Sequence, residues 1–159
     1  MLNWVKFISA FLFALVTVIV ITVFYNANKP IATVKDTAAE AAVRSGQIMT
    51  VDAIQPYNGT ESMVTVFGVN QDGEKVAVFV NEQDEKNFQE VKLADGVSKE
   101  QALQTVFKEH QVDKVLHVQL GIEENEPIWE VAFKNDSGKL NYVYILFKDG
   151  EWTKRILNL

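Results

Sequence analysis

Two patterns of apolar residues divide the chain. Residues 7–24 read FISAFLFALVTVIVITVF, an apolar run without a charged side chain. As a helix, this run spans roughly 27 Å, close to the roughly 30 Å hydrocarbon core of a bilayer. From residue 48 onward, short runs of β-branched and aromatic residues alternate with Asn, Asp and Gly, a pattern typical of strands and tight turns. The sequence therefore predicts one apolar helix followed by a β-rich part.

The apolar run is predicted to be an uncleaved membrane anchor. A buried core helix would show a polar face, and this run has none. A cleaved signal peptide has a shorter apolar region and an A-x-A site, whereas the sequence after this run is YNANKP. The chain has no Cys, which excludes a lipoprotein-type anchor. Trp4 and Tyr25 bracket the run, as aromatic residues do at membrane–water interfaces.

The orientation of the anchor is predicted from the short N-terminal tail. Lys6 precedes the run, and Lys29 and Lys35 follow it, so the positive-inside signal is nearly balanced. The short tail and the single span favour a cytoplasmic N-terminus, as in a signal anchor. We therefore expect a single-pass protein of the cell membrane whose later residues are extracytoplasmic.

The β-rich part contains an internal repeat. A shift of 65 residues aligns residues 61–73 with residues 126–138 without a gap, and an Asn and a Gly match in the two segments. Another β-rich run follows each matched glycine. Turn residues between β-branched and aromatic runs are a strong local signal for a hairpin, so each copy is predicted to contain one.

Upstream of each hairpin, the sequence predicts a helix and a further strand. The helices are expected at 36–45 and 98–110 and the strands at 48–56 and 114–122, with an extra strand at 151–157 in the second copy. The second helix begins with a Ser-x-x-Gln capping box. The predicted fold class is α+β, with an N-terminal transmembrane helix followed by two tandem α-β-β-β domains with antiparallel sheets. Copies of this size are near the lower limit for an independent core, so we expect them to pack together or to share a stiff connection.

The domain boundaries follow from these elements. A break is expected at 28–30, after the span, and Gly46 is expected to end the first exterior helix. The predicted parts are a cytoplasmic tail at 1–6, a transmembrane anchor at 7–25, a juxtamembrane linker at 26–35, a first domain at 36–82, a linker at 83–96 and a second domain at 97–159.

Aromatic residues of the second copy are the candidate binding residues. Strand alternation places Tyr142 and Tyr144 on one face, opposite Val143, while Trp129 shares a face with Val131. One interpretation is that the aromatic side chains complete a small core or the packing between the copies. The other is that they form a docking surface for a protein partner, since Trp and Tyr are enriched at interface hot spots. The candidates are Trp129, Tyr142, Tyr144 and Trp152.

The composition argues against several classes of partner. The chain carries 15 Lys and Arg against 21 Asp and Glu, a formal net charge of −6. Nucleic-acid binding needs a basic face, and adsorption to anionic lipid headgroups needs basic clusters. The acidic balance argues against both and suits a domain kept soluble by its charge.

Catalytic, cofactor and metal motifs are not found in the sequence. Without Cys there is no thiol nucleophile, and no G-x-S-x-G, S-x-x-K or glycine-rich phosphate loop occurs. His110 and His117 are interpreted as satisfied or exposed rather than as zinc ligands. The acidic runs at 84–85 and 123–126 lack calcium-loop spacing and are interpreted as solvated turns. We therefore predict a protein that is not an enzyme and binds no cofactor or metal.

The arrangement resembles the YpmB family of Gram-positive bacteria, also named TseB, a cell-wall elongation regulator. The second copy resembles a PepSY domain through S-K-E-Q-A at 98–102, I-W-E-V at 128–131, the D-S-G turn at 136–138 and Y-V-Y at 142–144. The resemblance implies a cystatin-like fold for each copy, a TseB-like first domain and a PepSY-like second domain. It also implies extracytoplasmic placement and association with a class B penicillin-binding protein.

Two functional hypotheses of different classes follow. The first is a membrane-anchored accessory protein that binds and regulates a class B penicillin-binding protein in cell-wall elongation. The second is an inhibitor of an extracytoplasmic peptidase, since PepSY-like domains resemble protease propeptide modules. A sensory role is a further alternative, although the six-residue cytoplasmic tail is too short to signal inward alone.

Overall fold

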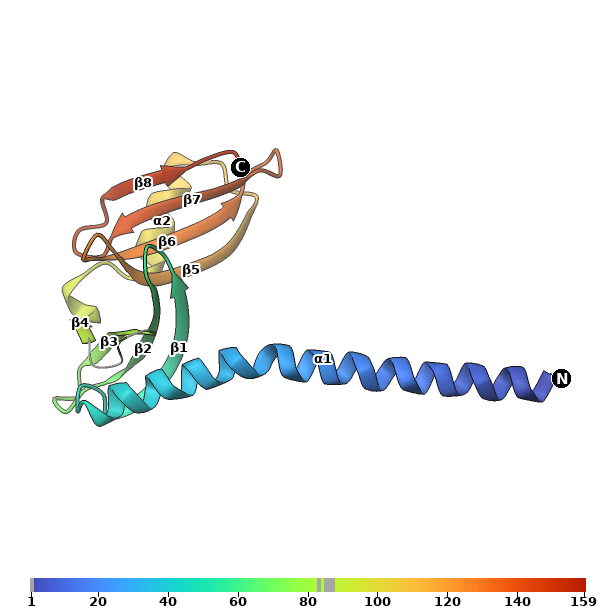
Figure 1. Ribbon diagram of the computed structural model, residues 1–159. Coiled ribbons are helices and arrows are strands. Elements are labelled where there is room, and N and C mark those ends of the chain that lie inside the picture. Colours follow the sequence, from blue (N-terminus) through green and yellow to red (C-terminus); the bar gives the residue numbers. More distant parts are fainter. Residues whose placement is uncertain (1, 83, 85–87) are drawn as a thin grey trace.

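The protein is an α+β chain in which a long N-terminal helix leads into two antiparallel sheets (Figure 1). The computed structural model describes residues 2–82, 84 and 88–159. The first sheet follows α1 (Leu2–Arg44) and contains, in order, β1 (Thr50–Asn58), β2 (Ser62–Val69), β3 (Lys75–Asn81) and β4 (Phe88–Lys92). After the 3₁₀ turn η1 (Leu93–Asp95) and α2 (Lys99–Glu109), the second sheet contains β5 (Lys114–Glu123), β6 (Glu126–Lys134), β7 (Leu140–Leu146) and β8 (Trp152–Ile156).

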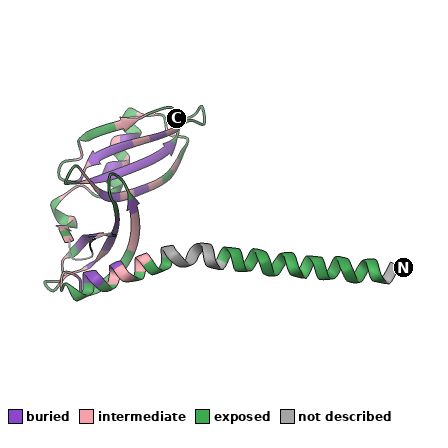
Figure 2. Ribbon diagram, in the orientation of Figure 1, coloured by how far each residue is buried: buried purple, intermediate pink, exposed green. Residues whose placement is uncertain are grey.

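Helix α1 is continuous from the apolar segment to the first sheet. Its segment Trp4–Phe24 has a mean hydropathy of 2.8, is long enough to cross a membrane and is fully exposed (Figure 2). The expected break at 28–30 is wrong, because α1 extends through these residues, and the residues predicted as a linker at 26–35 are helical.

The C-terminal part of α1 is the helix of the first copy. Ala38, Ala41 and Ala42 are buried against the first sheet. Alanine lets the helix approach the sheet closely, and the facing side chains are mostly valines, at positions 64, 66, 76, 78 and 80. The helix ends as expected at Gly46, whose φ of 79° suits glycine and whose N–H donates to the Val43 carbonyl.

The first copy has a fourth strand that sequence analysis missed. Residues 83–96 were predicted to be a linker, but β4 pairs antiparallel with β3, from Val76↔Lys92 to Val80↔Phe88. Each copy therefore has four strands, and the extra strand predicted for the second copy alone, at 151–157, is matched by β4 in the first. The charged residues before β4 suggested a linker. However, β4 is a short edge strand, and edge strands tolerate charged residues.

The internal repeat is confirmed by the backbone register. A β-bulge interrupts β1 at Asp52 and β5 at Leu116, at the same point of each pairing. The two hairpin turns are also alike. The Asn70 side-chain oxygen accepts from the N–H groups of residues 72 and 74, and that of Asn135 accepts from those of residues 137 and 139. The glycine of each turn, at positions 73 and 138, has a positive φ.

The second copy builds its core around α2. The predicted capping box is present: the Gln101 N–H donates to the Ser98 hydroxyl, and the Ser98 N–H donates to the Gln101 side chain. Ala102 and Val106 are buried against the sheet, as their spacing predicts. Phe107, one position after Val106, is 46 % exposed.

The two copies pack against each other, which was one of the two arrangements expected from their small size. The side chains of Tyr57, Met63, Ala77 and Phe79 lie on the face of the first sheet away from α1, and they join the same apolar core as α2 and the second sheet. The first sheet is thus buried on both faces, between α1 and the second copy (Figure 2).

Candidate partner-binding face

The four aromatic candidates lie on opposite faces of the second sheet. Trp129 is 6 % exposed on the face toward α2, where its indole N–H donates to the Val97 carbonyl at 2.8 Å. Trp152 pairs with Ile145 on that same side and is covered by the Arg155 guanidinium at 3.6 Å from the ring centre. The four residues therefore do not form one surface, and Trp129 is a core residue.

Tyr142 and Tyr144 lie on the other face, which we call the open face: the side of the second sheet away from α2. In Figure 1, α2 lies behind this sheet and the β1–β2 hairpin crosses in front of one end of it. Residues opposite each other on neighbouring strands share a face. From the end near the first sheet outward, the rows of the open face are Gly121–Ile128–Leu146, Gln119–Glu130–Tyr144–Lys154, His117–Ala132–Tyr142–Ile156 and Lys114–Lys134–Leu140.

The inner row is covered by the first copy. A Cβ on Gly121 would lie 2.4 Å from the ring of Tyr57, so only glycine leaves room for this side chain. Tyr57 and Gly121 occupy equivalent positions of β1 and β5, which means that a large residue of one copy fits against the glycine of the other. This contact fixes how far the β1–β2 hairpin reaches across the open face.

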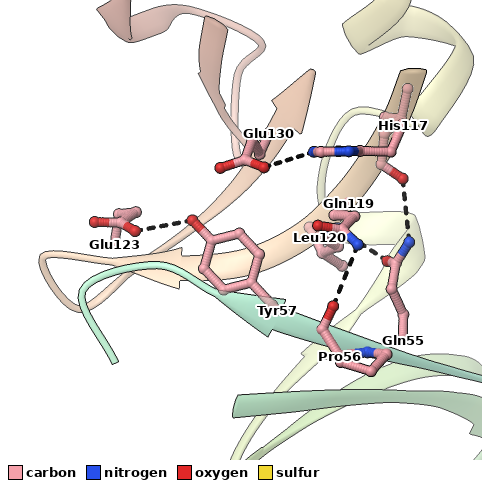
Figure 3. Close-up of polar contacts among 9 residues, drawn as sticks. Gln55, Pro56, Tyr57, His117, Gln119, Leu120, Glu123 and Glu130 are labelled. Carbon is pink, nitrogen blue, oxygen red and sulfur yellow. Dashed lines mark hydrogen bonds and ion pairs between the residues drawn. The ribbon is translucent and has the colours of Figure 1, made fainter. Parts of the chain in front are cut away.

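Two equivalent glutamines bond the edge strands of the copies to each other. The Gln55 side chain accepts from the Leu120 N–H and donates to the Val118 carbonyl, at 3.3 and 3.2 Å (Figure 3). The Gln119 amide donates to the Pro56 carbonyl at 3.3 Å. Thr65, which is fully buried, donates to the Leu120 carbonyl at 2.7 Å. Gln55 and Thr65 thus satisfy backbone groups of β5, and Gln119 satisfies one of β1, at edges that would otherwise be free.

Glu123 fastens the β1–β2 loop to the tip of the β5–β6 hairpin. Its carboxylate accepts from the Tyr57 hydroxyl at 2.9 Å and from the N–H and hydroxyl of Thr60 at 3.0 and 2.7 Å. Burial alone raises the pKa of Glu123, but these hydrogen bonds outweigh it, so the pKa lies below its usual value. The prediction that residues 123–126 form only a solvated turn is therefore wrong for Glu123.

A buried carboxylate occupies the centre of the open face. Glu130 is 7 % exposed, and its oxygen lies 2.7 Å from His117 Nε2 (Figure 3). Because the carboxylate accepts, the ring nitrogen donates. Burial, together with the adjacent Glu130 carboxylate, raises the pKa of Tyr144 above its ordinary value. The neutral phenol and the histidine thus compensate a charge that would be costly without partners.

The outer half of the open face is free and basic. This half consists of the two outer rows, where Lys114 and Lys134 are exposed and directly opposite each other. On the next row inward, Lys154 lies 5.2 Å from the centre of the Tyr144 ring. Within the part of the chain that the structure describes, no ion pair involves Lys114 or Lys134. Tyr142 is half-buried beside them, with its ring 6.2 Å from that of His117.

The histidines and acidic runs do not form a metal site among the described residues, where no cluster of three or more His, Asp or Glu side chains has suitable geometry. His110 ends α2 and packs on the ring of Phe133 at 5.6 Å. Burial, followed by the charge of Arg155, lowers the pKa of His110. Asp84 is exposed, and residue 85 lies outside the described part of the chain.

The residues that join the copies and the lysines of the outer half were not predicted from the sequence. A signal for the glutamines was present, because Gln55 and Gln119 occupy equivalent positions in the first strand of each copy. The lysines were counted only in the net charge. Their positions on one face become visible when the registers of β5, β6 and β7 are known.

The fold and this face define a class of protein: an apolar N-terminal helix carrying two four-stranded α+β copies, with a free face on the second. Residues 37–81 match the family model described as "Cell wall elongation regulator TseB-like domain". The solved structure of the YpmB protein from Bacillus subtilis is similar, with a TM-score of 0.70 and 25 % identity over 77 % of this chain and 95 % of that chain. A search of the curated proteins found no match.

The family model and the solved structure together support membership of the YpmB/TseB family. The matched region covers the helix end and the first three strands of the first copy, which is the part that connects the apolar helix to the second sheet. The description of the family supports a regulatory role in cell-wall elongation.

Proposed function

We propose that this protein is a membrane-anchored, extracytoplasmic accessory protein that binds a class B penicillin-binding protein and regulates cell-wall elongation. The observation that carries the proposal is the match of residues 37–81 to a cell-wall elongation regulator domain. The continuous helix α1 supports it, because the domain matched by that model is built directly on the helix that contains the apolar segment. Anchoring would confine the protein to the membrane plane of its partner and raise the effective concentration.

The orientation can be tested with single cysteines, because the chain has none of its own. In the proposed topology, Lys139→Cys reacts with a membrane-impermeant maleimide added to intact cells, and Asn3→Cys reacts only after the cells are opened. Labelling of Asn3→Cys in intact cells without labelling of Lys139→Cys would show that the topology is the reverse of the one proposed.

The partner can be tested with the full-length tagged chain. Membranes are labelled with fluorescent penicillin, solubilised in mild detergent and purified on the tag. We expect a labelled class B penicillin-binding protein to be enriched with the chain and not with a control membrane protein of the same abundance. If no labelled protein is enriched, the proposed partner is wrong.

The peptidase-inhibitor hypothesis requires a loop that is free to enter a catalytic cleft. The β1–β2 loop does not meet this requirement, because Thr60 in that loop is bonded to Glu123. No contact in the described residues favours the inhibitor over the accessory protein, and it remains a prediction from the sequence.

A further inference from the structure

The duplication leaves one equivalent face free. In the first sheet, the face away from α1 is buried beneath the second copy, and Ala77 there is fully buried. Its equivalent on the open face is Tyr142, which remains half-buried in the chain alone. The first copy covers the inner rows through Tyr57 and the β1–β2 loop, whereas Lys114 and Lys134 of the outermost row are exposed. The outer half of the open face is therefore the surface that a partner can reach.

The charge of this surface is opposite to that of the chain. The chain has a net charge of −6, yet Lys114 and Lys134 are adjacent on the outer row and neither has an ion-pair partner in the described residues. Like charges directly opposite each other destabilise a sheet, so this pair costs folding energy in the free protein. The nearest acidic residues in the sequence, Asp113 and Asp136, lie outside the strands, in the α2–β5 connection and the β6–β7 turn.

The surface also carries apolar side chains between its cations. Leu140, Tyr142 and Ile156 are half-buried on the two outer rows, beside the lysines. A phosphate polymer would be recognised by cationic side chains, best by the bidentate guanidinium of arginine, and would not need apolar contacts. Arg155 lies on the other face, where it pairs with Glu109 and covers Trp152. The chemistry fits a protein segment with acidic and apolar residues better than a plain polyanion.

We propose that the outer half of the open face binds an acidic, partly apolar segment of a protein partner. Lys114 and Lys134 pair with its carboxylates, and Tyr142, Leu140 and Ile156 pack on its apolar side chains. The acidic segment relieves the repulsion between the two lysines. The repulsion that destabilises the free protein therefore favours the complex. The inference rests on the proposed function, in which the partner is a class B penicillin-binding protein.

The first test is a double charge reversal in the full-length chain. Lys114→Glu with Lys134→Glu is compared with a matched control, Lys75→Glu with Lys99→Glu, which changes the net charge equally at exposed positions away from this face. We expect recovery of the labelled penicillin-binding protein to fall roughly tenfold or more in the first variant and to stay near wild type in the control. Equal recovery with both variants, from chains with the same thermal melt, overturns the surface and leaves the proposed function standing.

The second test does not depend on the identity of the partner. Tyr142 is replaced in cells by the photocrosslinking amino acid p-benzoylphenylalanine, and the crosslinked peptide is sequenced. We expect a protein segment rich in Asp, Glu and apolar residues, and loss of that crosslink when Lys114→Glu and Lys134→Glu are added. A crosslink to a wall polymer, to a basic segment or to nothing overturns the proposal. Such a result remains distinct from a failure of the proposed function, which the penicillin-labelled recovery measures.

Discussion

The two copies share a backbone plan and differ in what covers their sheets. Both have four strands, the same bulge and the same Asn–Gly turn. In the first copy, alanines of α1 pack on valines, and both faces of the sheet are buried. In the second copy, an independent helix packs on Trp129 and Phe133, and half of the opposite face stays free. The first copy is thus a connector, whereas the second offers a surface.

Equivalent positions of the two copies carry side chains of very different size. Trp129 of the second copy is equivalent to Val64 of the first, and Phe133 is equivalent to Gly68. A Cβ at Gly68 would lie 2.1 Å from the Thr50 carbonyl, because the chain entering β1 passes directly over it. In the first copy, the chain that leads from α1 into β1 occupies this space, so the position holds a glycine instead of a large side chain.

The largest loss of stability is expected from a substitution in the core of the second copy. Trp129→Ala removes a buried indole and leaves a cavity, so it should lower the free energy of unfolding by about 3–5 kcal/mol. Val64→Ala, at the equivalent position of the first copy, removes far less volume and should cost clearly less. Urea unfolding of both variants in the same detergent measures the comparison. Equal losses would show that the two cores do not differ as described.

A smaller effect is expected where the copies meet. Thr65→Val removes the hydroxyl that donates to the Leu120 carbonyl and leaves that buried acceptor without this partner. The expected loss of unfolding free energy is about 1–3 kcal/mol. Thr153→Val, at an exposed position of β8, serves as the control and should change stability little. A loss no larger than that of the control would mean that Thr65 does not hold β5 in place.

Helix capping should matter in the second copy alone. Ser98→Ala removes the N-cap hydroxyl of α2 and should cost about 1 kcal/mol. The helix of the first copy begins far upstream in α1 and has no N-terminus at the sheet, so no residue plays this part there. Thermal unfolding followed by circular dichroism gives the shift. A Ser98→Thr variant should recover most of the loss, and failure to do so would point to packing rather than capping.

The smallest effect concerns pH and Glu123. The folded-state pKa of Glu123 is lowered, so its contribution to stability is complete above the unfolded value of about 4.5 and is lost as the pH falls through the folded value. Glu123→Gln should therefore reduce stability at pH 7 and make less difference at low pH, where the wild-type carboxyl is protonated. Unfolding of both chains across this pH range tests the sign. A constant difference between them would contradict the hydrogen-bonded carboxylate.

Most of the fold could be predicted from local sequence patterns. The Asn and Gly residues of the turns aligned the copies, and the capping box located the start of α2 within one residue. Short-range hydrogen bonding decides these features, so residues a few positions apart suffice to predict them. The continuity of α1 was missed because a composition change after the span suggested a break, although packing of its end on the first sheet stabilises one long helix.

The site was harder to predict because it depends on contacts between distant residues. Gln55 and Thr65 look like ordinary strand residues, and their role appears only when β5 lies across the first sheet. Trp129, by contrast, was singled out for its type, and its burial followed from the position of α2. Residue type predicted which side chains were important and could not assign them to a core or to a surface.

The unbroken helix has a consequence for how the membrane itself acts on the protein. About ten residues separate the end of the apolar segment at Phe24 from Val34, which packs on the first sheet, a distance of roughly 15 Å along the helix. In the proposed anchored state, span and sheet form one lever. Membrane helices tilt by about 20° on average, and that tilt displaces the first sheet by roughly 5 Å. Because tilt adjusts to hydrocarbon thickness, a thinner or thicker bilayer would turn the open face toward a different direction.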